Sequence, residues 1–165
     1  MRILPFEYRV TKYDPRHRDD HGHYRRDEWT SASDIGRRFE SGVLTIEEYL
    51  RVERDYLSTL AACAAAAGCA ALTVTDREAR DLRDPVLRAG VEGARLPMPA
   101  VLEVARGVLR EQLWCRLEDE DRFFAHFGWD YYLYLGSATP IEQVAGAHGL
   151  FAEAMVSPYH RDGER

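Results

Sequence analysis

The stretch LWCRLEDEDRFFAHFGWDYYLYLGS, residues 113–137, decides the fold. Its apolar residues recur with a period of two, whereas those of the preceding segment recur every three or four positions. Three strand-like segments cover residues 113–117, 123–127 and 131–135. The connections between them are three to five residues long, as in β-hairpins. The stretch therefore predicts a three-stranded antiparallel meander near the carboxyl end.

Two long helices are expected before the meander. Thr45, Ile46, Glu47 and Glu48 have the form of a capping box, in which the threonine oxygen accepts a backbone N–H and the glutamate reaches back. Apolar residues follow at helical spacing, and an alanine run continues to Gly68, which can end the helix in a left-handed conformation. The second helix begins at residues 97–99, where two prolines precede an apolar stripe.

The remaining elements are shorter. Strands are expected at residues 3–13 and 71–75, short helices at 31–39 (capped by Ser31 or Ser33) and 140–149, and a helical turn or strand at 151–156. Residues 76–93 mix charges and glycines and are interpreted as a helical turn followed by a loop. The prediction is an α+β fold in which two long helices pack on an antiparallel sheet of four or five strands, ending in the meander. The length of 165 residues indicates one domain spanning residues 1–165.

Composition excludes several classes of function. The net charge of −6 argues against a nucleic-acid-binding protein that works by neutralising phosphates, and no apolar run approaches the length of a membrane span. The first ten residues lack the apolar stretch of a signal peptide, and the three cysteines form no CxxC pair. We therefore expect a cytoplasmic protein with reduced thiols, bound neither to nucleic acid nor to a membrane.

No sequence motif specifies a reaction. The chain has no GxSxG, GxxxxGK, HExxH or strand-linked GxGxxG pattern, so we expect no cofactor and more readily a binding protein than an enzyme. His126 could act as a general base beside Asp130 or Glu118, but without a partner nucleophile it is more typical of a histidine that faces water or packs in a sheet. Cys115 alternates with two leucines and is expected to be a buried thiol.

The acidity of the chain is concentrated in its last third. Residues 112–159 contain seven acidic and two basic side chains. The densest acidic run, residues 118–121, is followed by Trp129, Tyr132 and Tyr134 in the next turn and strand. Trp, Tyr and Arg are the side chains that most often anchor protein interfaces, and excess charge of one sign attracts an oppositely charged partner. The predicted partner-binding residues are Glu118, Asp119, Glu120, Asp121, Trp129, Asp130, Tyr132 and Tyr134. Strand alternation sends Tyr132 and Tyr134 to one face of the sheet, where they are either covered or exposed.

Three segments carry a resemblance to a known class of proteins. The sequence FFAHFGWDYYLYLGS at residues 123–137, and the segments WTSASDIGRRF and LTIEEYL nearer the amino end, resemble small acidic bacterial immunity proteins of toxin systems. The resemblance implies a protein that binds and blocks a cognate toxin. The acidic run and the region around Trp129 would then imitate the anionic substrate of that toxin, and the partner would be a basic protein.

Two alternatives remain open. His17, His21 and His23 lie in a polar loop with several aspartates, and imidazole and carboxylate groups are suitable ligands for a divalent metal. This loop could therefore support a metal-assisted hydrolase, although its spacing matches no zinc signature and a solvated loop is the simpler interpretation. The other alternative is a small ligand-binding or structural domain with a pocket between helices and sheet.

Overall fold

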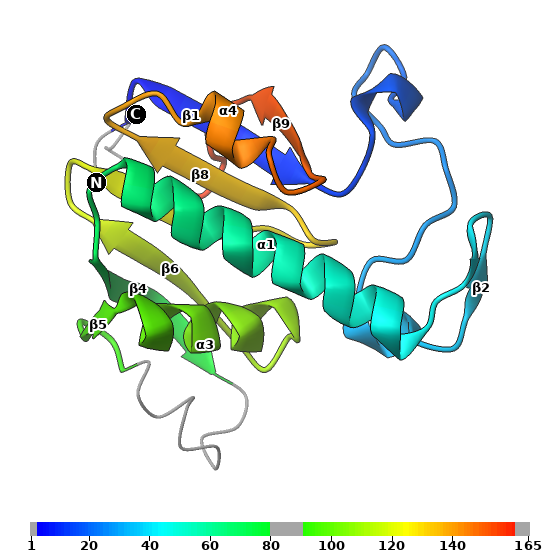
Figure 1. The fold of residues 1–165 in the computed structure, drawn as a ribbon, viewed down its shortest axis with the longest axis horizontal. Helices are drawn as coiled ribbons and strands as arrows, with labels where there is room; N and C mark the ends of the chain where they lie inside the picture. The colour runs from blue at the N-terminus through cyan, green and yellow to red at the C-terminus, as the bar shows by residue number, and fades with distance from the viewer. Residues whose placement is uncertain (1–2, 80–90, 161–165) are drawn as a thin grey trace.

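The computed structural model describes residues 3–79 and 91–160, which form a seven-stranded antiparallel sheet with helices on one face (Figure 1). The strand order is β5-β4-β6-β7-β8-β1-β9. The strands are β1 (Phe6–Thr11), β4 (Ala71–Ala79), β5 (Arg95–Pro97), β6 (Leu113–Asp119), β7 (Phe123–Phe127), β8 (Leu133–Ser137) and β9 (Phe151–Ala154). Strand β1 comes first in the chain but lies between β8 and β9, so the two ends of the sequence pair in one sheet.

The helices cover the face of the sheet that holds the main apolar core (Figure 1). They are α1 (Ile46–Ala66), α3 (Met98–Leu109) and the short α4 (Glu142–Ala145). A small hairpin of β2 (Arg38–Phe39) and β3 (Gly42–Val43) projects beyond the sheet beside the start of α1. Among the described residues, no helix combines the length and apolarity that crossing a membrane requires.

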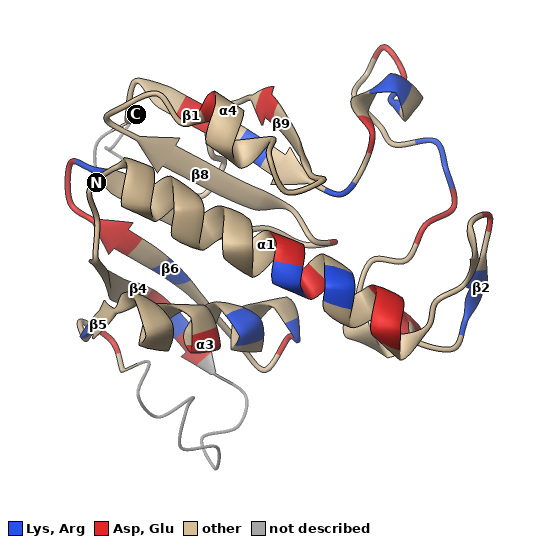
Figure 2. Cartoon of the chain, in the orientation of Figure 1, with Lys and Arg blue, Asp and Glu red and all other residues tan. Residues whose placement is uncertain are grey.

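Helix α1 begins and ends as its sequence indicates. The Thr45 hydroxyl oxygen accepts the backbone N–H of Glu48 at 3.2 Å, which satisfies one of the free donors of the first turn. At the other end Gly68 has a φ of 72°, and the N–H of Cys69 donates to the carbonyl of Ala64 at 2.8 Å. Because glycine adopts positive φ without steric cost, this arrangement ends the helix sharply. The charges of α1 lie in its first half, and the second half is apolar and alanine-rich (Figure 2).

The predicted class and central elements are confirmed, but the sheet is larger than expected. An antiparallel sheet carries two long helices, and β6, β7 and β8 are successive neighbours as the meander requires. Seven strands occur instead of four or five, because β4 with β5 extends one edge while β1 with β9 extends the other.

Several shorter elements differ from their predictions. The helix expected at residues 31–39 is one 3-10 turn, Ala32–Asp34, capped by Ser31, and the chain then enters β2. The strand expected at residues 71–75 continues to Ala79, since a bulge between Thr75 and Glu78 lets it follow β6 for longer. Residues 80–90 of the helical turn and loop predicted at 76–93 lie outside the described residues. The helix expected at 140–149 is confined to α4, and residues 151–154 form strand β9.

The second face of the sheet is polar, yet it is buried. Strand β7 has no exposed residue, because its two faces are covered by different parts of the chain. On the second face Leu4, Phe124 and Tyr134 form a small apolar cluster that also contacts Tyr159. Residues 155–160, which we call the C-terminal segment, thus pack on the face opposite the helices.

Gly136 is required by the packing of this second face. A Cβ atom at Gly136 would lie 2.1 Å from Cε1 of Phe124, whose ring is fully buried. We expect Gly136→Ala to lower the free energy of unfolding by about 2 kcal/mol or more, because overpacking forces the ring or the strand to move. Urea denaturation would measure the change.

Gly146→Ala is the matched control. The nearest atom to a Cβ there is 3.7 Å away, and its φ is −87°. We expect a change below about 0.5 kcal/mol. Equal stability of Gly136→Ala and the wild-type protein would contradict this description of the packing.

Candidate functional site

The structure divides the predicted partner-binding surface into two parts. The acidic run ends in the β6–β7 turn, whereas Trp129 and Asp130 lie in the β7–β8 turn. Successive turns of a meander lie at opposite ends of the sheet, and the five residues of β7 separate them by roughly 15 Å. The expectation of one continuous acidic and aromatic surface is therefore wrong.

The acidic run is itself partly internal. Glu118 and Asp119 belong to strand β6 and are buried, so the expectation that all four carboxylates are exposed is also wrong. Asp119 accepts hydrogen bonds from Arg122 at 2.8 Å and from Arg95 at 3.3 Å. Of the four acidic residues, only Glu120 and Asp121 are exposed to solvent.

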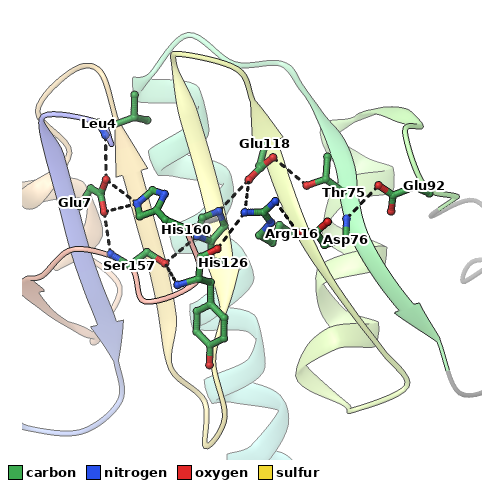
Figure 3. Close-up of polar contacts among 11 residues, drawn as sticks. Leu4, Glu7, Thr75, Asp76, Glu92, Arg116, Glu118, His126, Ser157 and His160 are labelled. Atoms are coloured by element: carbon green, nitrogen blue, oxygen red, sulfur yellow. Dashed lines mark hydrogen bonds and ion pairs between the residues drawn. The ribbon is translucent and has the colours of Figure 1, made fainter. Parts of the chain in front are cut away.

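Glu118 belongs to a row of polar side chains that crosses the second face of the sheet (Figure 3). The carboxylate accepts a hydrogen bond from Oγ1 of Thr75 at 2.9 Å, and its Oε1 lies 3.1 Å from Nε2 of His126. Nη1 of Arg116 lies 3.5 Å from the same oxygen. Burial alone would raise the pKa of Glu118, but these contacts outweigh it and lower the pKa to about 2. Glu118 is therefore ionised and neutralised internally.

His126 connects Glu118 to Ser157 in an arrangement that resembles a catalytic triad. The Nδ1 atom of His126 lies 2.8 Å from Oγ of Ser157, which also accepts the backbone N–H of Tyr159 at 3.2 Å. Because the carboxylate only accepts, a neutral imidazole donates from Nε2 to Glu118 and accepts from the serine hydroxyl at Nδ1. Burial lowers the pKa of His126, which favours this neutral form.

This chain of hydrogen bonds has a structural role in the described conformation. His126 and Ser157 are 0% and 1% exposed, and neither lines a described cleft. The Glu7 carboxylate continues the row: it accepts the N–H of Ser157 at 2.9 Å and lies 3.1 Å from Nε2 of His160 (Figure 3). The row thus fastens the C-terminal segment to the sheet, and the prediction that His126 packs within the sheet is confirmed.

The two predicted tyrosines are occupied by contacts within the protein. Tyr134 is buried and packs against Tyr159. Tyr132 is half-buried, and the guanidinium groups of Arg9 and Arg18 lie 5.4 and 5.5 Å from the centre of its ring. Of the two outcomes that the sequence left open, the structure thus shows Tyr134 covered and Tyr132 half-covered.

The β7–β8 turn presents Trp129 to solvent from a fixed backbone. Trp129 is 74% exposed, although it lies between buried strands. The next two residues, Asp130 and Tyr131, have φ values of 60° and 63°, which residues other than glycine rarely adopt. The hydroxyl of Tyr13 donates to the carbonyl of Asp130 and that of Tyr56 to the carbonyl of Tyr131, each at 2.7 Å. These bonds hold the strained turn in place.

A cleft of about 500 Å³ lies beside this turn, at the end of the sheet where β6 begins and β7 ends. Aromatic rings form much of its lining: Trp114, Phe127, Trp129, Tyr131 and Tyr159. Trp114 donates its indole N–H to the carbonyl of Phe127 at 2.8 Å, and Tyr131 donates its hydroxyl to Tyr49 at 2.7 Å. Trp114 and Tyr131 therefore donate their polar hydrogens to acceptors within the protein.

Three carboxylates also line the cleft: Glu78 from β4, Glu111 from the turn after α3, and Asp130. None of the three side chains has an ion pair or hydrogen bond to another described residue, in contrast to Glu118 and Asp119. All three residues are exposed. The cleft thus combines aromatic faces with carboxylates that no other described residue neutralises.

The histidine loop has a different arrangement. His21 and His23 are exposed with ring centres 6.3 Å apart, and Asp19 accepts the backbone N–H groups of both. His17 lies against Tyr24. Within residues 3–79 and 91–160, no group of three or more His, Cys, Asp or Glu side chains is arranged to hold a metal ion. This geometry gives no support to the metal-dependent alternative.

A search of protein-family models, curated proteins and solved structures finds no match to this chain. The site is therefore interpreted from its own geometry. Sequence reasoning identified Trp129 and Asp130 but missed four residues of the cleft, namely Glu78, Glu111, Trp114 and Tyr159. They come from three distant segments that only the sheet brings together, although the alternation around Cys115 places Trp114 on the face opposite that thiol.

The buried row makes the fold sensitive to acid. Because the pKa of Glu118 is lower in the folded protein than its ordinary value of 4.5, its carboxylate stabilises the fold above about pH 4.5 and loses this effect as the pH falls toward 2. His126 acts in the same direction below pH 6.5, since the unfolded chain takes up that proton more readily. We expect Glu118→Gln to lower the free energy of unfolding at pH 7 by about 2 kcal/mol, because the charged acceptor of His126 is lost while Asp76 still lies 2.6 Å from Arg116.

The same variant tests the linkage to pH. Urea denaturation at several pH values should show the stabilities of Glu118→Gln and the wild-type protein converging as the pH falls from 5 toward 3. Parallel pH profiles for the two proteins would show that Glu118 is not ionised and paired as described.

Proposed function

We propose that this protein binds a basic partner protein through the cleft beside Trp129 and so blocks the positively charged site of that partner. The observation that carries the proposal is an open cleft that joins an exposed tryptophan to three carboxylates without an ion pair to any described residue. The finer proposal, motivated by the resemblance described above, is that the partner is a toxin and the protein its immunity factor.

Trp129 has the properties of an interface anchor. At protein interfaces a few side chains, most often Trp, Tyr and Arg, cause most of the loss in binding energy when they are truncated. A side chain held on a rigid turn loses little conformational freedom on binding, so more of its contact energy contributes to affinity. The hydrogen bonds from Tyr13 and Tyr56 provide this rigidity here.

The charges that line the cleft indicate that the partner contacts it with a positively charged group. None of the described residues lining the cleft is basic, and three are acidic. A site of this kind repels anions and attracts cationic groups, and unpaired surface charge also accelerates the encounter. Glu120 and Asp121 at the far end of the sheet can contribute to this attraction without touching a partner seated at the cleft.

The proposal can be tested with the purified product of the gene beside the one that encodes this protein. We expect a one-to-one complex that Trp129→Ala weakens about tenfold or more, because the variant removes the central ring and leaves the turn intact. Isothermal titration calorimetry would measure both affinities. Failure of the wild-type protein to bind that product would remove the immunity interpretation.

A matched pair of charge variants separates contact from general attraction. Glu111→Gln with Asp130→Asn removes two carboxylates at the cleft, and asparagine tolerates the left-handed backbone at position 130. Glu120→Gln with Asp121→Asn removes the same charge at the opposite end. The first pair should weaken binding more than the second, and equal effects would contradict binding at the cleft.

A further inference from the structure

We infer that the cleft beside Trp129 takes the guanidinium group of an arginine side chain from the partner. This inference rests on the proposed function and specifies its chemistry. The aromatic walls, the acceptors at the rim and the way in which the protein stacks its own arginines lead to the same ligand group.

The lining excludes most other ligands. An anion would meet Glu78, Glu111 and Asp130 with no basic side chain among the described lining residues. The indole N–H of Trp114 and the hydroxyl of Tyr131 are committed within the protein, so a neutral polar ligand would find fewer donors than acceptors in the cleft. The cleft also contains the Thr30 hydroxyl, the Trp129 indole and the Tyr159 hydroxyl, but its formal charges are all negative and lie beside aromatic faces, which together suit a cation.

A planar cation fits this lining better than a compact one. Guanidinium stacks flat on an aromatic ring, is less strongly hydrated than ammonium, and has five N–H donors in a fixed fork. The carboxylates of the cleft come from β4, from the turn after α3 and from the β7–β8 turn. A fork of donors can reach acceptors on separate elements while the ring plane stays against Trp129.

The protein uses the same chemistry internally. The guanidinium of Arg18 lies 5.8 Å from the ring centre of Tyr24 and 5.5 Å from that of Tyr132, and its Nε is 3.3 Å from Glu153. One guanidinium is thus held by two rings and a carboxylate. The cleft presents these same components with no described cation among its lining residues.

The one lysine of the chain shows what an ammonium group requires. Nζ of Lys12 lies 4.1 and 4.2 Å from the ring centres of Tyr13 and Trp29 and 3.1 Å from Glu28. That cage is closed, and burial lowers the pKa of Lys12 in spite of Glu28. In the open cleft an ammonium would keep its water and gain less from the rings, whereas the arginine stem and plane can lie along Trp129.

Three five-residue peptides test the inference: acetyl-Gly-Gly-X-Gly-Gly-amide with arginine, lysine or citrulline at X. Citrulline keeps the planar shape of arginine but has no charge. Binding to the intact protein is followed by isothermal titration calorimetry at low salt, a readout that does not depend on Trp129. We expect the arginine peptide to bind about fivefold or more tightly than the lysine peptide. We expect the citrulline peptide to bind no better than a control peptide with glycine at X.

Variants place the binding at the cleft. Trp129→Ala and the pair Glu111→Gln with Asp130→Asn should each remove most of the arginine preference, whereas Glu120→Gln with Asp121→Asn should retain it. Equal affinity for arginine and lysine peptides, or an arginine preference that survives Trp129→Ala, would overturn the inference. If no peptide binds while the partner complex still depends on Trp129, the guanidinium assignment fails and the proposed function stands; loss of both refutes both.

Discussion

Two side chains of helix α1 fix both sides of the cleft. Tyr56 donates its hydroxyl to the carbonyl of Tyr131 at 2.7 Å, and the buried carboxylate of Glu53 accepts Nε and Nη2 of Arg110 at 2.7 and 2.8 Å. The first contact holds the turn that carries Trp129, and the second holds the end of α3 immediately before Glu111. Tyr131 lies in the β7–β8 turn and Arg110 lies at the end of α3. Because helix α1 holds both, its position on the sheet determines the distance between these two sides of the cleft. Both groups have a second partner, since the Tyr56 oxygen accepts the Lys12 N–H at 2.7 Å and Glu53 accepts the Tyr49 hydroxyl at 3.2 Å, and these added bonds keep the two side chains in place.

The second face of the sheet explains why the acidic run is not a surface. A seven-stranded sheet with polar residues on one face ordinarily exposes that face to water. Here the C-terminal segment covers it, so Glu118, His126 and Glu7 must satisfy one another and the backbone of that segment. The acids of strand β6 therefore contribute to folding, and the acids that remain available at the cleft are Glu78 of β4 and, in two turns, Glu111 and Asp130.

Much of the fold could be predicted from the sequence because its signals are local. The capping threonine and Gly68 delimit α1, and the boundaries of β7 match the predicted residues 123–127. The position of β1 between β8 and β9 could not be predicted, since strand pairing across the whole chain leaves no local signal. The alternation that places Tyr132 and Tyr134 on one face was readable, but the arginines and the Tyr159 ring that occupy them come from distant segments.

The site was only half predictable for the same reason. Trp129 and Asp130 are conspicuous because a large ring and a carboxylate follow a glycine in a short turn. Glu78 and Glu111 are unremarkable charged residues until the sheet brings them beside that turn. The pairing of Glu118 and Asp119 was also hidden, since a run of four acids is the same in sequence whether it is solvated or paired with arginines of β6, of the following turn and of β5.

The central claim is that Trp129 contacts a cationic group of the partner, and the indole N–H signals of the protein test it most directly. The chain has three tryptophans, of which Trp29 is buried in the core and Trp129 is exposed. In a nitrogen–proton correlation spectrum, assigned with Trp129→Phe, addition of the arginine peptide should shift the Trp129 signal progressively and leave the Trp29 signal in place. A Trp129 signal that stays fixed while the peptide binds elsewhere would contradict the account.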